Sequence, residues 1–344
     1  MADRLDRLGE FGIIGLFRSE SRPGRRWVVC GIGDDCAVLE AGGRERLLVT
    51  TDMLVERIHF LRDGITPRQL GHKTMAVNLS DVAAMGGEPT AAFLAMGLCS
   101  DLEVSFIEEF REGLLACARE HQVDLLGGDT VSCKRDLVLC LTVLGRADRD
   151  EVVLRSGARP GDRVLVGGVV GDSAAGLHLV LGRPGDIGAV ARARLLRAHL
   201  EPQPQVALGR LLATRRLATA MIDVSDGVLQ DLGHICEESG VGAEIDADCL
   251  PVSDDARRLA AAAGLDARDW ALAGGEDFVL LFCAPAERER EVQEACRDQL
   301  GIEVASIGMI TGQAGVRVRR DKEWREVTVR GHDHFRASGE RIAT

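Results

Sequence analysis

The sequence places aspartates where apolar segments end and small residues begin, a setting in which carboxylates can do chemistry. Two are adjacent in GIGDDCAVL, and the others lie in LLVTTD, VNLSD, LLGGD and MIDVSD, the last of which holds two. In chain order they are Asp34, Asp35, Asp52, Asp81, Asp129, Asp223 and Asp226. Taken singly, each is explained by the preference of Asp for helix N-caps and turns. As a group they indicate one site, because strand ends in open α/β sheets form a common ligand crevice.

Several carboxylates at one place need a counter-charge. Two of them about 4 Å apart repel by roughly 4 kcal/mol at an effective dielectric of 20. Magnesium (Mg²⁺) suits such a set better than zinc, since it takes hard oxygen ligands and keeps positions for water and phosphate oxygens. The hydroxyls of Thr50 and Thr51, next to Asp52, offer further oxygen ligands. The pattern therefore predicts a magnesium site that accepts a phosphate ester.

Glycines beside the acids favour the same interpretation. Gly127 and Gly128 precede Asp129, and Gly31 and Gly33 precede the acid pair in GIGDD, so backbone N–H groups could approach a phosphate closely. The chain has no GxxxxGK[ST] P-loop, no GxGxxG dinucleotide motif and no GxSxG nucleophile elbow. A nucleoside triphosphate would therefore be bound by another kind of fold.

The elements that must position these residues alternate between strands and helices. Apolar runs predict strands at 47–51, 91–98, 124–126 and 137–144, with helices from Thr66-Pro67 and across 106–117 between them. Segment 145–162 is rich in charge, Gly and Pro and predicts a joint between domains. Beyond it we expect strands at 164–170, 219–224 and 278–283, and helices from 172 and 226. The prediction is two α/β domains, 1–148 and 149–344.

Composition excludes several classes of function. The 344 residues are 46% hydrophobic, enough for two cores, and 42 Lys and Arg against 54 Asp and Glu give a net charge of -12. That charge would repel nucleic acid and anionic membranes, and no run approaches the roughly 18 apolar residues of a membrane span. The ten cysteines form no CxxC or CxxH pair, so we interpret them as free thiols in a reducing compartment. With no signal-peptide pattern at MADRLDRLGEFGII, we expect a cytoplasmic protein.

Nine segments together resemble one family. They are GIGDDCAVL, TTDMLVERIHF, KTMAVNLSDVAAMGG, GGDT, LRSGARPGD, GDSAAGL, IDVSDGVLQDLGHI, LAGGEDFVLLF and GHDHF, in order from Gly31 to Phe335. This set resembles the thiamine-monophosphate kinases of the aminoimidazole ribonucleotide synthetase-like superfamily. The resemblance implies a two-domain α/β (α+β) fold of that type, with an N-terminal mixed sheet and helices, a C-terminal α/β domain, and a homodimer in which the N-terminal sheets associate.

The same resemblance implies an activity and a site. The reaction would be transfer of the γ-phosphate of ATP to thiamine monophosphate, assisted by several magnesium ions. Carried over by position, the metal shell would be Asp35, Thr50, Thr51, Asp52, Asp81, Asp129, Asp223 and Asp226. Nucleotide contacts would be Asp35, Gly128, Asp129, Arg155 and Ser225, and contacts to thiamine monophosphate would be His59, Glu276 and His332.

Some positions depart from the family pattern or stay undecided. His332 stands where the family generally has an aromatic residue, so either His332 stacks on the thiamine ring more weakly or nearby Phe335 compensates. Arg57 stands where glycine is expected and His72 where an aromatic residue is expected, and the chain has no tyrosine. The roles of Asp34 and Asp277 are open.

Alternatives remain. An aminoimidazole ribonucleotide synthetase or a hydrogenase-maturation enzyme would share the metal site, and TTDMLVERIHF and GHDHF argue against both. A selenophosphate synthetase would need a reactive Cys near the N-terminus, and Cys30 is not in such a motif. A catalytically silent protein that binds nucleotide or magnesium is the remaining possibility.

Overall fold

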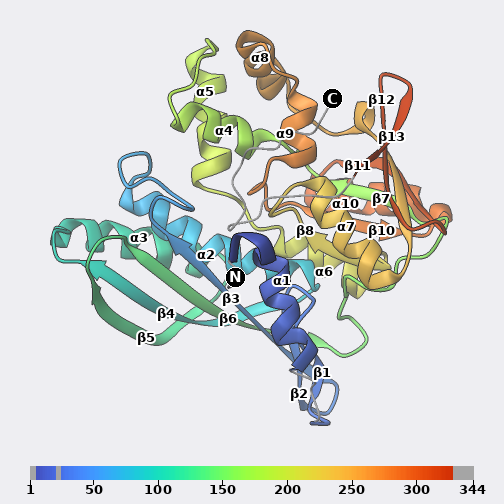
Figure 1. Ribbon diagram of the computed structural model, residues 1–344. Coiled ribbons are helices and arrows are strands. Elements are labelled where there is room, and N and C mark those ends of the chain that lie inside the picture. The colour runs from blue at the N-terminus through green and yellow to red at the C-terminus, as the bar shows by residue number, and fades with distance from the viewer. Residues whose placement is uncertain (1–4, 21–24, 328–344) are drawn as a thin grey trace.

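The computed structural model describes residues 5–20 and 25–327, and within them the chain builds two sheets with their own helices (Figure 1). The first sheet has the strand order β1-β2-β3-β6-β4-β5. Its strands are β1 (Val28–Cys30), β2 (Ala37–Gly42), β3 (Glu45–Val55), β4 (Glu88–Cys99), β5 (Asp124–Cys133) and β6 (Val138–Asp148). β4 and β5 are parallel and the other neighbours antiparallel, so the sheet is mixed, as expected.

Two long helices cover one face of this sheet, α2 (Pro67–Ala84) and α3 (Val104–Glu120). α2 begins as the sequence predicts, since Thr66 forms a capping box with Gln69 and Pro67 is the first helical residue. The helix is buried on nearly all sides, because the sheet and α3 cover part of it and elements of the second half cover the rest. α1 (Leu5–Glu20) joins the second half instead, through an ion pair between Arg18 and Glu238 at 2.6 Å.

The second sheet has the strand order β13-β12-β9-β11-β7-β10-β8. Its strands are β7 (Arg163–Gly167), β8 (Ala220–Asp223), β9 (Gly242–Asp246), β10 (Leu280–Ala284), β11 (Val304–Thr311), β12 (Gly315–Arg320) and β13 (Glu323–Val327). Its helices are α4 (Asp172–Val180), α5 (Ala189–Leu200), α6 (Val206–Thr214), α7 (Val228–Ser239), α8 (Asp254–Ala263), α9 (Ala267–Ala273) and α10 (Glu289–Leu300), with short 3₁₀ turns η1 (Ala247–Cys249) and η2 (Ala286–Arg288). Among its described strands only β9 and β12 are parallel neighbours, so this sheet is mixed as well.

Strand alternation places a core on each face of the second sheet. Val164 and Val166 of β7 point into one core with α4, α7 and α9, whereas Leu165 points into another with α6 and α10. Ala83 and Ala84, the last residues of α2, belong to this second core. The two halves of the molecule therefore pack directly on each other through α2.

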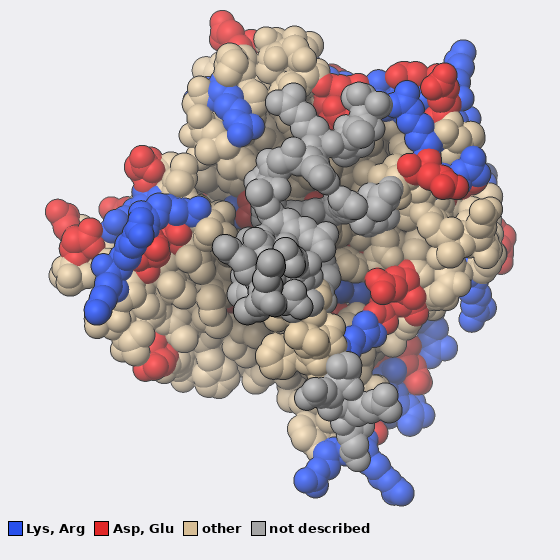
Figure 2. Space-filling model, viewed as in Figure 1, with Lys and Arg blue, Asp and Glu red and all other residues tan. Residues whose placement is uncertain are grey.

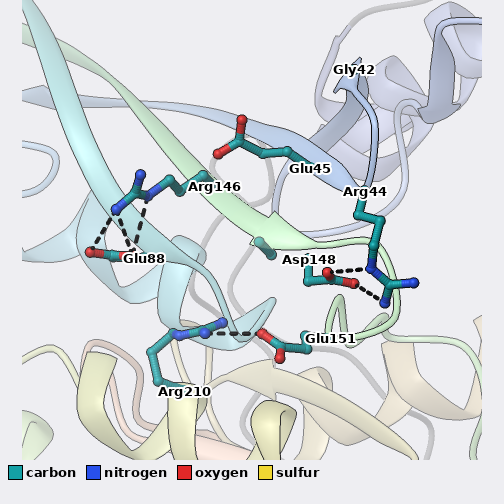
Figure 3. Close-up of a pocket in the computed structure, with 9 residues that line it drawn as sticks. Gly42, Arg44, Glu45, Glu88, Arg146, Asp148, Glu151 and Arg210 are labelled. Carbon is teal, nitrogen blue, oxygen red and sulfur yellow. Dashed lines mark hydrogen bonds and ion pairs between the residues drawn. The ribbon is translucent and has the colours of Figure 1, made fainter.

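A hollow of about 460 Å³ lies at the joint between the halves, lined by paired charges (Figure 3). Arg146 pairs with Glu88, and Arg44 pairs with Asp148. Arg210 of α6 donates to the backbone oxygen of Gly86 at 2.6 Å and to Glu151 at 3.0 Å. Among these contacts, the hydrogen bond from Arg210 to Gly86 joins α6 of the second half to the first half. In the described part of the chain no helix has the length and apolar character of a bilayer span.

Candidate metal and nucleotide site

Three of the aspartates meet where the two halves touch. Asp35 lies in the loop between β1 and β2, Asp81 on α2 and Asp223 at the end of β8. Each offers a carboxylate oxygen, and the three oxygens lie within 4.8 Å of one another. Residues separated by up to 188 positions are thus brought to one point, which is the convergence that the sequence pattern predicts.

Neutral hydrogen-bond donors and acceptors hold this acid cluster in place. Thr50 donates its hydroxyl to Asp81, and Ser80 donates to Asp223 over 2.6 Å, which ties α2 to β8. The backbone N–H of Asp52 donates to the side-chain oxygen of Asn78 at 3.0 Å. Sequence reasoning missed Asn78 and Ser80. The signal that could have found them is their place within one turn of Asp81 on the same helix.

Burial and mutual repulsion raise the pKa values of the acids. The pKa of Asp223 rises to about 7, through burial first and then the charge of Asp35. That of Asp52 rises to about 6 for the same two reasons, and that of Asp81 rises because of burial and of Asp52, Asp223 and Asp35. Buried carboxylates that resist ionisation next to one another are the environment that a cation relieves.

The donor set fits magnesium. One carboxylate oxygen of Asp35, Oδ2, is buried and has no hydrogen-bond partner among the described residues. An unsatisfied buried anionic oxygen is costly, and a hard cation at the centre of the acid cluster would satisfy it. The available ligands are all oxygens, from carboxylates and from the hydroxyl of Thr50, with no cysteine or histidine among them.

The adjacent acids Asp34 and Asp35 have different tasks. Asp34 accepts the backbone N–H of Arg155 at 3.1 Å and that of Asp35 at 3.0 Å, so it fastens the loop around residue 155 onto the GIGDD turn. Asp35 instead points into the acid cluster and accepts the guanidinium of Arg155 at 2.6 Å. The hydrogen bonds that the structure gives Asp34 are with backbone N–H groups, which favours a structural role for it.

Of the other expected nucleotide or metal residues, Arg155 contacts the acid cluster, and Ser225 and Asp226 closely follow β8 in the chain. The guanidinium of Arg155 is beside Asp35, with 21% of its side chain exposed. Asp226 follows Asp223 by three residues and accepts Gln230 at 2.7 Å. Between them, Ser225 accepts the backbone N–H of Glu276 at 2.8 Å, which joins the nucleotide candidates to the substrate candidates.

Thr51 and Asp129 are not brought to the acid cluster. Side chains alternate along a strand, so Thr51 points to the face of the first sheet opposite to Thr50 and Asp52, and its hydroxyl donates to the backbone oxygen of Leu141. Asp129, preceded by Gly128, lies on β5, with β6 and β4 between it and β3. Thr51, Gly128 and Asp129 are exposed in the single chain.

The expected substrate contacts form a second group. His59 accepts the backbone N–H of Val55 at 3.0 Å through Nδ1, which leaves the ring proton on Nε2. Glu276 pairs with Lys73 at 3.1 Å and with His199 at 3.3 Å. His59 contributes to the electrostatic environment of Glu276, so the two candidates lie near each other. His332 lies outside the described residues.

The structure gives contacts for Arg57 and His72, which depart from the family pattern, and for Asp277, whose role was open. Arg57 has a φ of 68°, the left-handed conformation in which glycine is at ease, so the expectation of glycine there reflects the backbone. Its guanidinium pairs with Asp136. His72 contacts the backbone oxygen of Pro202 at 2.8 Å. Asp277 accepts the N–H groups of Gly171 at 2.6 Å and Ser173 at 3.0 Å, so it anchors the start of α4.

Comparison with known proteins defines the class of this fold and site. The family description "AIR synthase related protein, N-terminal domain" matches residues 33–147, and its C-terminal counterpart matches residues 159–321. A thiamine-monophosphate kinase of Escherichia coli O157:H7 is 39% identical over 95% of this chain and 98% of its own length. One from Bacillus subtilis is 35% identical over 89% and 93%. The structure of AaThiL complexed with AMPPCP and TMP superposes with a TM-score of 0.85, at 34% identity, over 97% of this chain and 99% of that one.

The fold is thus that of an AIR synthase related protein, which confirms the expected fold class. Within that class, the chain belongs to the thiamine-monophosphate kinase family. The hydrogenase maturation protein HypE, at 19% identity and a TM-score of 0.69, shares the fold alone.

Proposed function

We propose that this protein transfers the γ-phosphate of ATP to thiamine monophosphate, giving thiamine diphosphate and ADP. The observation that carries the proposal is the acid cluster of Asp35, Asp81 and Asp223, each with an oxygen within 4.8 Å of the others, together with the buried Oδ2 of Asp35, which has no hydrogen-bond partner among the described residues. Full-length similarity to thiamine-monophosphate kinases supplies the substrate.

The proposed site residues fall into a group that binds magnesium and a group that contacts the nucleotide. Asp35, Thr50, Asp52, Asp81, Asp223 and Asp226 would hold magnesium. Magnesium, when bound, neutralises the charge on the phosphates and so favours in-line transfer. Arg155 faces the same point with a guanidinium that can clamp a phosphate in a bidentate manner. With Ser225 it forms the proposed nucleotide contact of the second half of the chain.

The acceptor needs little activation. A phosphate monoester has a second pKa near 6, so its attacking oxygen is already anionic at neutral pH. The protein must position this oxygen and offset the repulsion between its negative charge and the phosphates of ATP. A strong general base is not required. His59 and Glu276 would hold the ring system of thiamine monophosphate, with His332 as a third contact.

We further propose a homodimer that covers the outer face of the first sheet. That face exposes Met53 (52%), Phe93 (39%) and Val131 (57%), and few charged side chains lie over β4 and β5 (Figure 2). An exposed apolar sheet face and an open edge strand favour association with a second copy. Thr51 and Asp129 lie on this side, so the dimer would bring them, with Gly128, against the partner. Light scattering measures the mass directly, and Val131→Arg would give a monomer.

The proposed reaction is tested by following ADP release with thiamine monophosphate as acceptor and with free thiamine as the control. Phosphorylated product from thiamine monophosphate, with none from free thiamine, supports the proposal. Nucleotide binding without ADP release would instead indicate a catalytically silent protein. ADP release that requires an aminoimidazole ribonucleotide precursor would indicate a synthetase of the same class.

A further inference from the structure

Lys73 is a buried charge that neither the metal site nor the nucleotide contacts use. The chain has three lysines, Lys73, Lys134 and Lys322, and otherwise takes its positive charges from arginine. Lys73 lies on α2 with 1% of its side chain exposed, in a stretch whose neighbours Leu70 and Met75 belong to the core. Lysine is almost never fully buried unless it is paired, so its partner defines its role.

The partner is Glu276, from the other half of the chain. Lys73 Nζ lies 3.1 Å from Oε1 of Glu276, and Nδ1 of His199 lies 3.3 Å from Oε2. His199 also contacts the hydroxyl of Ser173 at 3.0 Å. Burial and the charge of Lys73 lower the pKa of His199 to about 4, so the imidazole is neutral near pH 7. Lys73 is therefore the principal positive charge on this carboxylate, with a neutral imidazole on its other oxygen.

This pairing keeps Glu276 ionised and fixed in direction. Burial by itself would raise the pKa of Glu276, but Lys73, His199 and His59 together lower it. The backbone of Glu276 has a φ of 65°, a left-handed conformation that is rare for a residue other than glycine. Its N–H donates to Ser225 at 2.8 Å. Strained backbone of this kind persists where surrounding contacts determine it, and it is concentrated at ligand sites.

We propose that Lys73 is a positioning residue for recognition of the substrate ring system: its ammonium holds Glu276 as a carboxylate aimed at the N–H donors or the cationic ring of thiamine monophosphate. This inference rests on the proposed function. A compact ammonium suits the task, because it occupies one carboxylate oxygen and leaves the other to His199. The guanidinium fork of an arginine tends to take both oxygens of a carboxylate.

Lys73→Met tests the proposal, because it removes the charge and keeps most of the length. We expect the KM for thiamine monophosphate to rise about tenfold or more, because the variant removes one charge of a buried ion pair and each 1.4 kcal/mol lost in binding is about tenfold. The KM for ATP should stay within about twofold, since Lys73 contacts neither the acid cluster nor Arg155. Lys134→Met, at an exposed position, is the matched control and should leave both constants unchanged.

Further variants separate charge from packing. In Lys73→Met/Glu276→Gln the effects should be non-additive, with the double variant close to Glu276→Gln alone. Lys73→Arg keeps the charge, so it should bind thiamine monophosphate more tightly than Lys73→Met, whereas a packing role predicts the reverse order. If Lys73→Met and Lys73→Arg do not fold, Glu276→Gln carries the test, because 26% of the Glu276 side chain is exposed.

The outcomes that overturn the inference are distinct from those that overturn the function. A folded Lys73→Met enzyme with an unchanged KM for thiamine monophosphate, additive effects in the double variant, or an unchanged KM in Glu276→Gln would each reject the role of Lys73. Wild-type protein that releases no ADP with thiamine monophosphate would reject the proposed function itself. Calorimetric titration of thiamine monophosphate without ATP would then show whether Lys73→Met weakens ring binding.

Discussion

Asp223→Asn should stabilise the metal-free protein although it destroys the proposed magnesium site. The carboxylate oxygens of Asp35, Asp81 and Asp223 lie within 4.8 Å, and two charges at that distance repel by about 3.5 kcal/mol at an effective dielectric of 20. The amide keeps the size of the side chain and an oxygen that can accept from Ser80. Allowing for relaxation, we expect the free energy of unfolding above pH 7 to increase by about 2 kcal/mol, or roughly 4 °C in Tm.

The pH dependence gives this prediction a sign. Asp223 has its pKa raised to about 7 in the folded protein, above the unfolded value of about 3.9. Its contribution to stability is therefore fully present below about pH 4 and is lost as the pH rises through about 7. The variant should match the wild type at acid pH and exceed it above neutrality. Magnesium should stabilise the wild type strongly by binding the folded state, and the variant far less.

Thermal unfolding with a chelator and then with magnesium, across pH, measures both effects. Asp277→Asn is the matched control: both of its carboxylate oxygens accept backbone N–H groups, at 2.6 and 3.0 Å. An amide there leaves one N–H facing an NH₂ group, so this variant should lose stability with or without magnesium. The reasoning is refuted if Asp223→Asn is also less stable in chelator, or if magnesium stabilises it as much as the wild type.

Gly128→Ala should lower the free energy of unfolding by about 2 kcal/mol in urea titrations, because φ is +155° and the new Cβ would lie 1.7 Å from the backbone oxygen of Leu94. Gly127→Ala, whose Cβ would meet only the Phe93 ring at 3.7 Å, should be neutral within about 0.5 kcal/mol; equal losses would contradict the steric argument. His332→Trp should lower the KM for thiamine monophosphate about threefold to tenfold, since a larger ring adds roughly 0.5–1.5 kcal/mol of stacking; a higher KM would show that His332 does not stack. Protons compete with magnesium at Asp223, whose pKa is about 7, so the apparent Kd for magnesium from calorimetry should fall as the pH rises from about 5 to 8, and a flat profile would count against the assigned ligands.

Much of the fold follows from local signals in the sequence. The start of α2 is fixed by Thr66 and Pro67, whose capping geometry the structure reproduces. Apolar runs located β3, β4, β5, β6, β7, β8 and β10, although each structural strand has its own bounds. The C-terminal strands β12 and β13 and helices α8 to α10 were not specified, because their short segments mix charged and apolar residues and gain definition only from tertiary packing.

The site was predictable to the extent that its residues carry a motif. Period-two alternation alone separates Thr50 from Thr51, and applying it would have assigned them to opposite faces of the sheet. By contrast, nothing local distinguishes Asp34 from Asp35. Their roles depend on which one meets the backbone of Arg155, a contact across 121 positions that forms only in the folded molecule.

The same long-range character explains why each part of the site spans both halves of the chain. In the acid cluster Ser80 of the first half donates a hydrogen bond to Asp223 of the second half. At the proposed nucleotide contact, Asp34 of the first half accepts the backbone N–H of Arg155. At the ring-binding candidate Lys73 pairs with Glu276. Because α2 contributes Lys73 and Ser80 and also packs on α6 and β8, a small displacement of this helix would disturb metal, phosphate and ring contacts together. We therefore expect the packing of α2 to set the geometry of the proposed site, so that its near-complete burial serves function as well as stability.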